Sequence, residues 1–96
     1  MSKEQQLLNF LNENIFDPII SAPYASSQLK DDFLSMREML QDFSAKGILY
    51  FVWTSLFNKE NELILCNRLI DEGFHFYKSV TDNFKKNFSY EWLLSS

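Results

Sequence analysis

Histidine and cysteine are almost absent from this chain, which has one of each, Cys66 and His75, among 96 residues. A single cysteine cannot form an internal disulfide, and a metal site needs several converging His, Cys or carboxylate ligands. If both residues lie on one helix, their separation of nine positions places the thiol and the imidazole on opposite faces, so they cannot act as a nucleophile and its base. We therefore expect no enzymatic activity, no cofactor and no metal.

Glycine and proline are also scarce, with two of each. Sandwiches and barrels of β-strands need many turns, and turns draw on these residues. Phenylalanine is abundant instead: ten Phe, together with four Tyr and two Trp, supply a large apolar area for a small core. The composition predicts an all-α fold, a compact four-helix bundle-like single domain over residues 1–96.

Clustered positive charge is missing. The chain has 9 basic and 13 acidic residues, a net charge of −4, and only Lys85 and Lys86 are adjacent basic residues. Nucleic acids and anionic membrane surfaces are bound by clustered cations, so we expect neither as a direct partner. The first ten residues, MSKEQQLLNF, have no long apolar stretch of the secretory type, which favours a cytoplasmic protein.

No apolar run is long enough to span a membrane, which takes about 20 residues. The longest is GILYFVWTSLF, Gly47–Phe57, which lacks any charged residue. A helix that is apolar on all sides is surrounded by other helices. The run therefore predicts a short buried central helix, and four of its residues are expected to face two long helices: Leu49, Val52, Trp53 and Leu56.

Two helices are expected before this run. The first spans about Lys3–Asn14 and ends near Asp17–Pro18, because the residue before a proline avoids the helical conformation. The second starts at a serine cap, Ser26 or Ser27, and ends at Gly47 as a left-handed cap. Its apolar stripe, with spacings of 4, 3, 4 and 3, is Leu29, Phe33, Met36, Leu40 and Phe43.

A long C-terminal helix is expected from about Lys59 to Asn87, capped by Asn58. It passes through Gly73 at a cost of about 1 kcal/mol. The reason is that apolar residues on both sides of the glycine share one helical phase: Leu63, Cys66, Ile70, Phe74, Tyr77, Val80, Phe84 and Phe88. The last residues, Tyr90–Leu94, are too apolar for a free tail and are expected to fold back on the bundle.

An alternative is an α+β fold with a hairpin at 47–70. Val, Ile, Tyr, Phe and Trp favour strands, and NKEN, residues 58–61, would then form the hairpin loop. Against it, NKEN lacks the glycine that short hairpin loops favour.

One polar stripe is a candidate binding site. Asp31, Ser35, Glu38 and Asp42, at spacings of 4, 3 and 4, lie opposite the apolar stripe of the second helix. Like charges four residues apart destabilise a helix by a few tenths of a kcal/mol. The stripe is either a solvated face that keeps the protein soluble or a docking face for a basic protein partner.

The profile as a whole is typical of small acidic proteins that bind and block another protein. Immunity proteins, antitoxins and anti-defence inhibitors are of this kind. The partner expected here is a protein with a basic surface, and nucleic-acid-processing enzymes are one class of such partners. Two alternatives remain open. One is a structural homo-oligomer, such as a homodimer that hides apolar area between copies. The other is a protein that binds a small apolar ligand between its helices.

Overall fold

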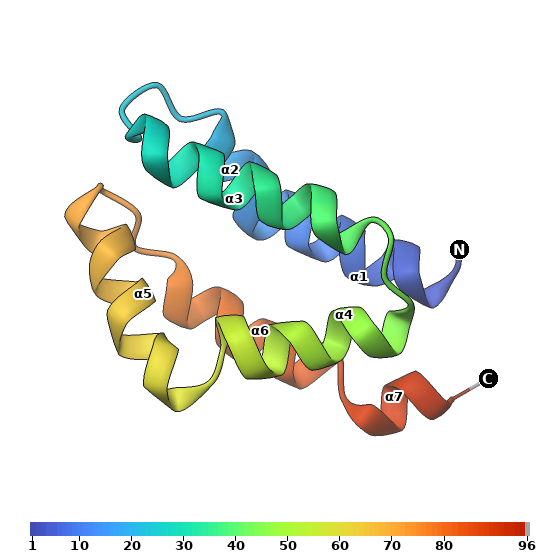
Figure 1. Cartoon of the computed structure of the whole chain (residues 1–96). Helices are drawn as coiled ribbons and strands as arrows, with labels where there is room; N and C mark the ends of the chain where they lie inside the picture. Colours follow the sequence, from blue (N-terminus) through green and yellow to red (C-terminus); the bar gives the residue numbers. More distant parts are fainter. Residues whose placement is uncertain (96) are drawn as a thin grey trace.

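The first half of the chain forms two antiparallel helical runs. The computed structural model describes residues 1–95. The first run consists of α1 (Lys3–Leu11), a π-helical turn (Asn12–Phe16) and α2 (Asp17–Ile20), and the second is α3 (Ser27–Leu40). Figure 1 shows α3 returning beside α1 and α2, so that together they make one layer of the molecule.

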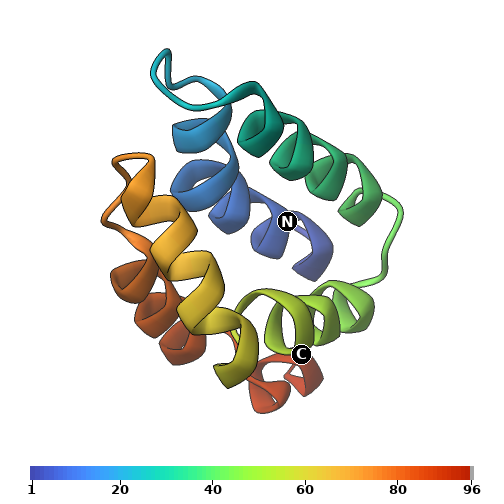
Figure 2. The ribbon, with the colours of Figure 1, turned by 60° about the vertical axis from the view of Figure 1, so that its left-hand side comes forward.

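The second half supplies the opposite layer. It consists of α4 (Ala45–Phe51), a second π-helical turn (Val52–Leu56), α5 (Lys59–Asp71), α6 (Tyr77–Asn87) and α7 (Tyr90–Leu94). Figure 2 shows the layer of α1 and α3 lying across α4, α5 and α6. Residues 1–95 contain no strand, so the all-α prediction is confirmed and the hairpin at 47–70 is wrong. The four-helix bundle-like arrangement stays a prediction.

Both layers bury apolar side chains in a shared core. The apolar stripe predicted for the second helix faces the core, since Leu29, Phe33 and Leu40 of α3 are buried and Met36 is half-buried. Phe43 is half-buried too, but it lies beyond the end of α3. On the C-terminal side the buried residues include Phe74, Tyr77, Val80, Phe84 and Phe88. The C-terminal segment folds back as expected, because the ring of Trp92 packs 4.8 Å from that of Phe88.

The prediction that the first helix ends near Asp17–Pro18 is wrong. The N–H of Asp17 donates to the carbonyl of Asn12, five residues earlier, and this wide turn resets the hydrogen-bond ladder. Pro18 therefore falls in the first turn of α2, where a helix needs no backbone N–H donor. The helical path continues to Ile20 and places Ile15, Phe16 and Ile19 in the core.

The prediction that the second helix continues to a cap at Gly47 is also wrong. α3 ends at Leu40, and the N–H of Phe43 donates to the Leu40 carbonyl at 3.1 Å. Ser44 then caps the next helix, because its hydroxyl accepts from the N–H of Gly47 at 3.1 Å. Gly47 has no positive φ and lies inside α4.

The long helix expected over Lys59–Asn87 is broken at Gly73. This glycine has a φ of +96°, which residues with a Cβ rarely adopt. The N–H of Phe74 donates to the Leu69 carbonyl at 2.8 Å, and that of Gly73 donates to the Ile70 carbonyl at 2.9 Å. This pair of bonds is the Schellman motif that ends helices, so α5 and α6 are separate elements.

The apolar run 47–57 is helical as far as Leu56, but it is not buried on all sides. Leu49, Val52 and Leu56 face the core as predicted. Trp53, predicted to face inward, is 39% exposed, and Tyr50 is 71% exposed. The short central helix therefore covers the core with one face and presents an aromatic face outside it. None of the helices described in residues 1–95 is long and apolar enough to cross a membrane.

Candidate functional site

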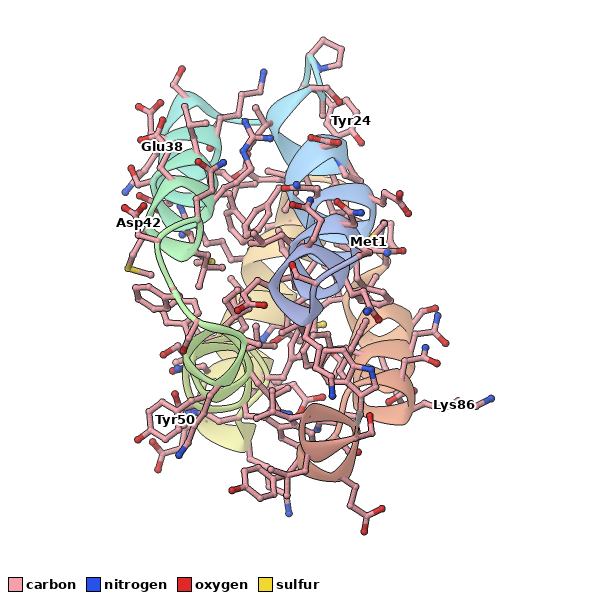
Figure 3. The ribbon with its side chains drawn as sticks, turned by 90° about the vertical axis from the view of Figure 1, so that its right-hand side faces the viewer. Met1, Tyr24, Glu38, Asp42, Tyr50 and Lys86 are labelled. Carbon is pink, nitrogen blue, oxygen red and sulfur yellow. The ribbon has the colours of Figure 1, made fainter. Side chains whose placement is uncertain are left out.

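The four residues of the candidate docking stripe are all exposed. Asp31, Ser35 and Glu38 lie on α3, and Asp42 lies in the turn after that helix. Figure 3 shows Glu38 and Asp42 projecting from the same edge of the molecule. We call these four residues the acidic face. The prediction that Glu38 and Asp42 form a like-charge pair on one helix is wrong, because α3 ends at Leu40, two residues before Asp42.

The start of α3 is fixed by two sets of hydrogen bonds. The Ser26 hydroxyl caps the helix by accepting from the N–H of Leu29 at 3.2 Å. The N–H and hydroxyl of Ser26 donate to the carboxylate of Glu72 at 2.6 and 2.9 Å. Glu72 follows α5, so these bonds tie the two layers together at the end of α3 that carries Asp31.

The carboxylates of the acidic face have no ion-pair partner within residues 1–95. The ion pairs there join Arg37 to Asp17 at 3.1 Å and Arg68 to Asp32 at 2.8 Å. Asp32 is therefore paired, whereas its neighbour Asp31 is not. The face combines three acidic side chains with one hydroxyl, which suits charge attraction and hydrogen bonding to a basic surface.

Cys66 and His75 lie on different elements, so they do not share the single helix on which they were expected to occupy opposite faces. Cys66 is half-buried on α5, and His75 is exposed in the connection between α5 and α6. Across residues 1–95, no group of three or more His, Cys, Asp or Glu side chains is placed to hold a metal ion.

Tyr77 is the one described residue whose pKa is clearly shifted. Its hydroxyl is buried and donates to the carbonyl of Leu56. Burial raises the pKa of this hydroxyl well above its usual range, and the nearby charge of Glu62 raises it further. The ring lines a cavity of about 420 Å³ between α5 and α6 together with Cys66. A phenol held neutral in this way acts as a structural hydrogen-bond donor.

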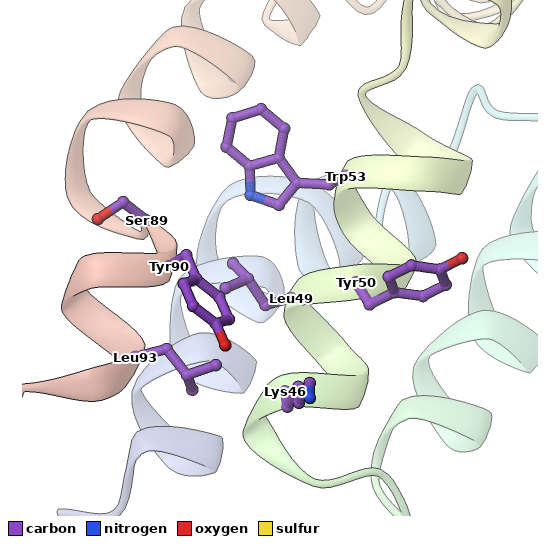
Figure 4. A pocket seen from close by; sticks show the side chains of 7 residues that line it. All are labelled: Lys46, Leu49, Tyr50, Trp53, Ser89, Tyr90 and Leu93. Atoms are coloured by element: carbon purple, nitrogen blue, oxygen red, sulfur yellow. The ribbon is translucent and has the colours of Figure 1, made fainter.

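A second surface feature is an apolar groove between α4 and α7, with a volume of about 460 Å³. We call it the α4–α7 groove. Figure 4 shows its lining, which consists of Lys46, Leu49, Tyr50, Trp53, Ser89, Tyr90 and Leu93. Leu49 is buried and Leu93 half-buried, while Tyr90 is 59% exposed.

Sequence reasoning missed this groove because it placed Trp53 in the core. The signal that was available is chemical: Tyr50 and Trp53 carry polar tips and lie three residues apart, on one side of a helix. What the sequence does not reveal is that residues 89–93 return to the same place. Comparisons of the chain with protein-family models, with curated proteins and with solved structures find no match in any of the three.

Proposed function

We propose that this chain is a small acidic protein-binding module that docks on a basic protein partner and blocks it. Inhibitors, immunity proteins, antitoxins and anti-defence proteins act in this way, and nucleic-acid-processing enzymes are partners of suitable charge. In this proposal the protein works in the cytoplasm and does not catalyse a reaction. The observation that carries the proposal is the acidic face, which holds three exposed carboxylates with no ion pair inside the described chain.

Two features support a binding role for this face over a purely solvating one. The neighbouring carboxylates of Asp17 and Asp32 are each paired with an arginine, whereas the three carboxylates of the acidic face have no such partner in the described chain. Three residues of the acidic face, Asp31, Ser35 and Glu38, also lie on a helix whose start is held by hydrogen bonds and whose inner side is buried. Asp42 follows two residues after the end of that helix. A rigid, unpaired row of charge steers an oppositely charged partner and fixes its orientation.

The test is a capture experiment with a charge-matched control. The wild-type chain and the triple variant D31N/E38Q/D42N are immobilised, exposed to extract of cells that express the chain, and eluted with a salt gradient. The control is E13Q/D71N/D82N, which removes the same number and types of acid from exposed positions outside the acidic face. Eluted proteins are identified by mass spectrometry.

We expect one stoichiometric partner with a basic surface, retained equally by the wild type and the control. The triple variant should release it at lower salt, because attraction between exposed charges is weakened by ionic screening. A partner that leaves the triple variant and the wild type at the same salt concentration would rule out the acidic face as its docking site.

A structural homo-oligomer is the second candidate. Leu63, Ile64 and Ile70 are exposed on α5, and a surface helix with this many exposed apolar residues is suited to an interface between copies. Light scattering at micromolar concentration tests it. A dimer that the variant L63N/I70N converts to a monomer supports this candidate, and a wild-type monomer excludes it.

A further inference from the structure

The α4–α7 groove has the size and lining of a small-molecule site. Its volume of about 460 Å³ is in the range of pockets that hold ligands of drug size. Leu49 and Leu93 contribute its aliphatic part, and the rings of Trp53 and Tyr90 contribute its aromatic part (Figure 4). Most of the lining is aliphatic or aromatic, and Ser89 adds a single aliphatic hydroxyl. A ligand that fits this lining is therefore largely apolar.

The two ends of the groove carry positive charge. Lys46 lines one end, in the first turn of α4. Trp53 lines the other end, and the ammonium of Lys85 lies 5.4 Å from the centre of its ring. In a chain with a net charge of −4, two lysines at one apolar groove are a local reversal of sign. They complement a ligand with a negative group.

The dimensions favour a small molecule over a docked helix. Lys46 and Trp53 are seven residues apart on one helical path, which spans about 10 Å. The opposite wall, α7, has five residues and is about 7.5 Å long. A helix that docks in a groove uses anchors at positions such as i, i+4 and i+7, which extend over about 10 Å. The wall formed by α7 is shorter than that.

We propose that the α4–α7 groove binds a free, flexible apolar carboxylate, with the apolar part between Trp53 and Tyr90 and the carboxylate at Lys85, whose ammonium lies beside the Trp53 ring. This site is separate from the acidic face on α3, and it does not depend on the proposed function. Glu91 is the acid of α7, and it is not part of the lining.

The probe for this proposal is decanoate, compared with neutral decanol and with the decyltrimethylammonium cation. Isothermal titration calorimetry measures the affinity of each probe, and amide NMR shifts locate it on the chain. We expect saturable binding of decanoate at one site, with shifts centred on residues 46–53 and 89–93. The neutral probe should bind about three- to five-fold more weakly, and the cation more weakly still.

Adjacent residues provide matched control variants. K85A should raise the Kd of decanoate about three- to five-fold without changing that of decanol. K86A removes a neighbouring lysine that projects into solvent (Figure 3) and should leave both values unchanged. On α7, Y90S should raise the Kd of both probes about ten-fold because a ring of the wall is lost, whereas L94S changes an exposed residue outside the lining and should have no effect.

Three results would overturn the proposal. The first is no saturable binding of decanoate, or shifts centred elsewhere on the chain. The second is equal affinity for the anionic and cationic probes, which would mean that the lysines do not select charge. The third is a concentration-dependent dimer whose interface, mapped by the same NMR shifts, covers the groove and is not displaced by decanoate, because a second copy would then be the occupant.

Discussion

Tyr77 connects α6 to the end of the second π-helical turn through one buried side chain. Its hydroxyl donates to the carbonyl of Leu56 at the end of the second π-helical turn, and its ring packs 5.7 Å from that of Phe57. The backbone carbonyl of Tyr77 in turn accepts from the hydroxyl of buried Thr81 at 2.8 Å. Because the raised pKa keeps the phenol neutral, this donor persists to high pH.

The substitution Tyr77→Phe tests this role through the dependence of stability on pH. In the wild type the unfolded chain loses the phenol proton near pH 10, while the folded chain keeps it. The folded state then binds more protons, so the free energy of unfolding should fall by about 1.4 kcal/mol per pH unit above pH 10 from this residue alone. Below pH 10, Tyr77→Phe should cost about 1–3 kcal/mol, since it leaves the Leu56 carbonyl unpaired.

The measurement is urea unfolding at several pH values between 8 and 11. In Tyr77→Phe, the free energy of unfolding should lack the decline above pH 10 that the Tyr77 phenol causes. The control Tyr50→Phe, which changes an exposed ring, should keep that decline. Equal slopes for the wild type and Tyr77→Phe would contradict the account of this residue.

Single residues also explain which helix starts could be predicted. The sequence places caps at Ser26 or Ser27 and at Asn58, because each precedes a clear helical pattern, and in the structure the caps are Ser26 and Asn58. Ser44 escapes detection, since the apolar stripe of α3 runs on to Phe43 in the same helical phase and conceals the end of that helix.

At the scale of elements, the two glycines have opposite roles, and substitution by alanine separates them. Gly73→Ala should destabilise the fold by about 1–2 kcal/mol, because alanine is strained at a φ of +96° and its Cβ would lie 3.3 Å from the Tyr24 ring. Gly47→Ala should be neutral or stabilise by up to about 1 kcal/mol, since the added Cβ meets ordinary contacts inside a helix. Thermal unfolding of the two variants checks both values, and a Gly73→Ala variant as stable as the wild type would contradict the break between α5 and α6.

The second π-helical turn is a structural element of the core, and its leucine gives a prediction. Leu56 is 2% exposed, so Leu56→Ala should cost about 2–5 kcal/mol of the free energy of unfolding. Leu63 on α5 is 68% exposed, and Leu63→Ala should change stability by no more than about 0.5 kcal/mol. Chemical denaturation measures both. Similar costs for the two leucines would mean that the run 47–57 does not face the core.

The break at Gly73 shows why a shared helical phase is a weak argument for one continuous helix. The phase holds for α6, where Tyr77, Val80 and Phe84 are buried. In α5, Leu63 and Ile70 belong to the same predicted apolar stripe but are exposed to solvent, and the buried residue is Leu69, which is not part of that stripe. A Schellman turn starts a second helix in a new direction, so the inner faces of α5 and α6 are set by packing against the first layer and not by a common phase.

At the scale of the whole molecule, the surface divides into regions of different chemistry. The acidic face lies on and just after α3, and the apolar groove with its lysines lies between α4 and α7. The N-terminal segment contacts α7 beside that groove, because the ammonium of Lys3 donates to the carbonyls of Trp92 at 2.6 Å and Leu93 at 2.8 Å. Charge along one helix could be predicted from sequence. A groove formed by segments some 40 residues apart, 46–53 and 89–93, could not.

The proposed attraction between the acidic face and a basic partner is tested most directly by association kinetics. For the partner captured with the wild-type chain, the association rate constant is measured by stopped flow from low to high salt. The wild type should associate more slowly as salt rises, and D31N/E38Q/D42N should associate about ten-fold more slowly at low salt with a flatter salt dependence. The charge-matched control E13Q/D71N/D82N should follow the wild type. The same association rate constants and the same salt dependence for the wild type and the acidic-face variant would contradict the claim.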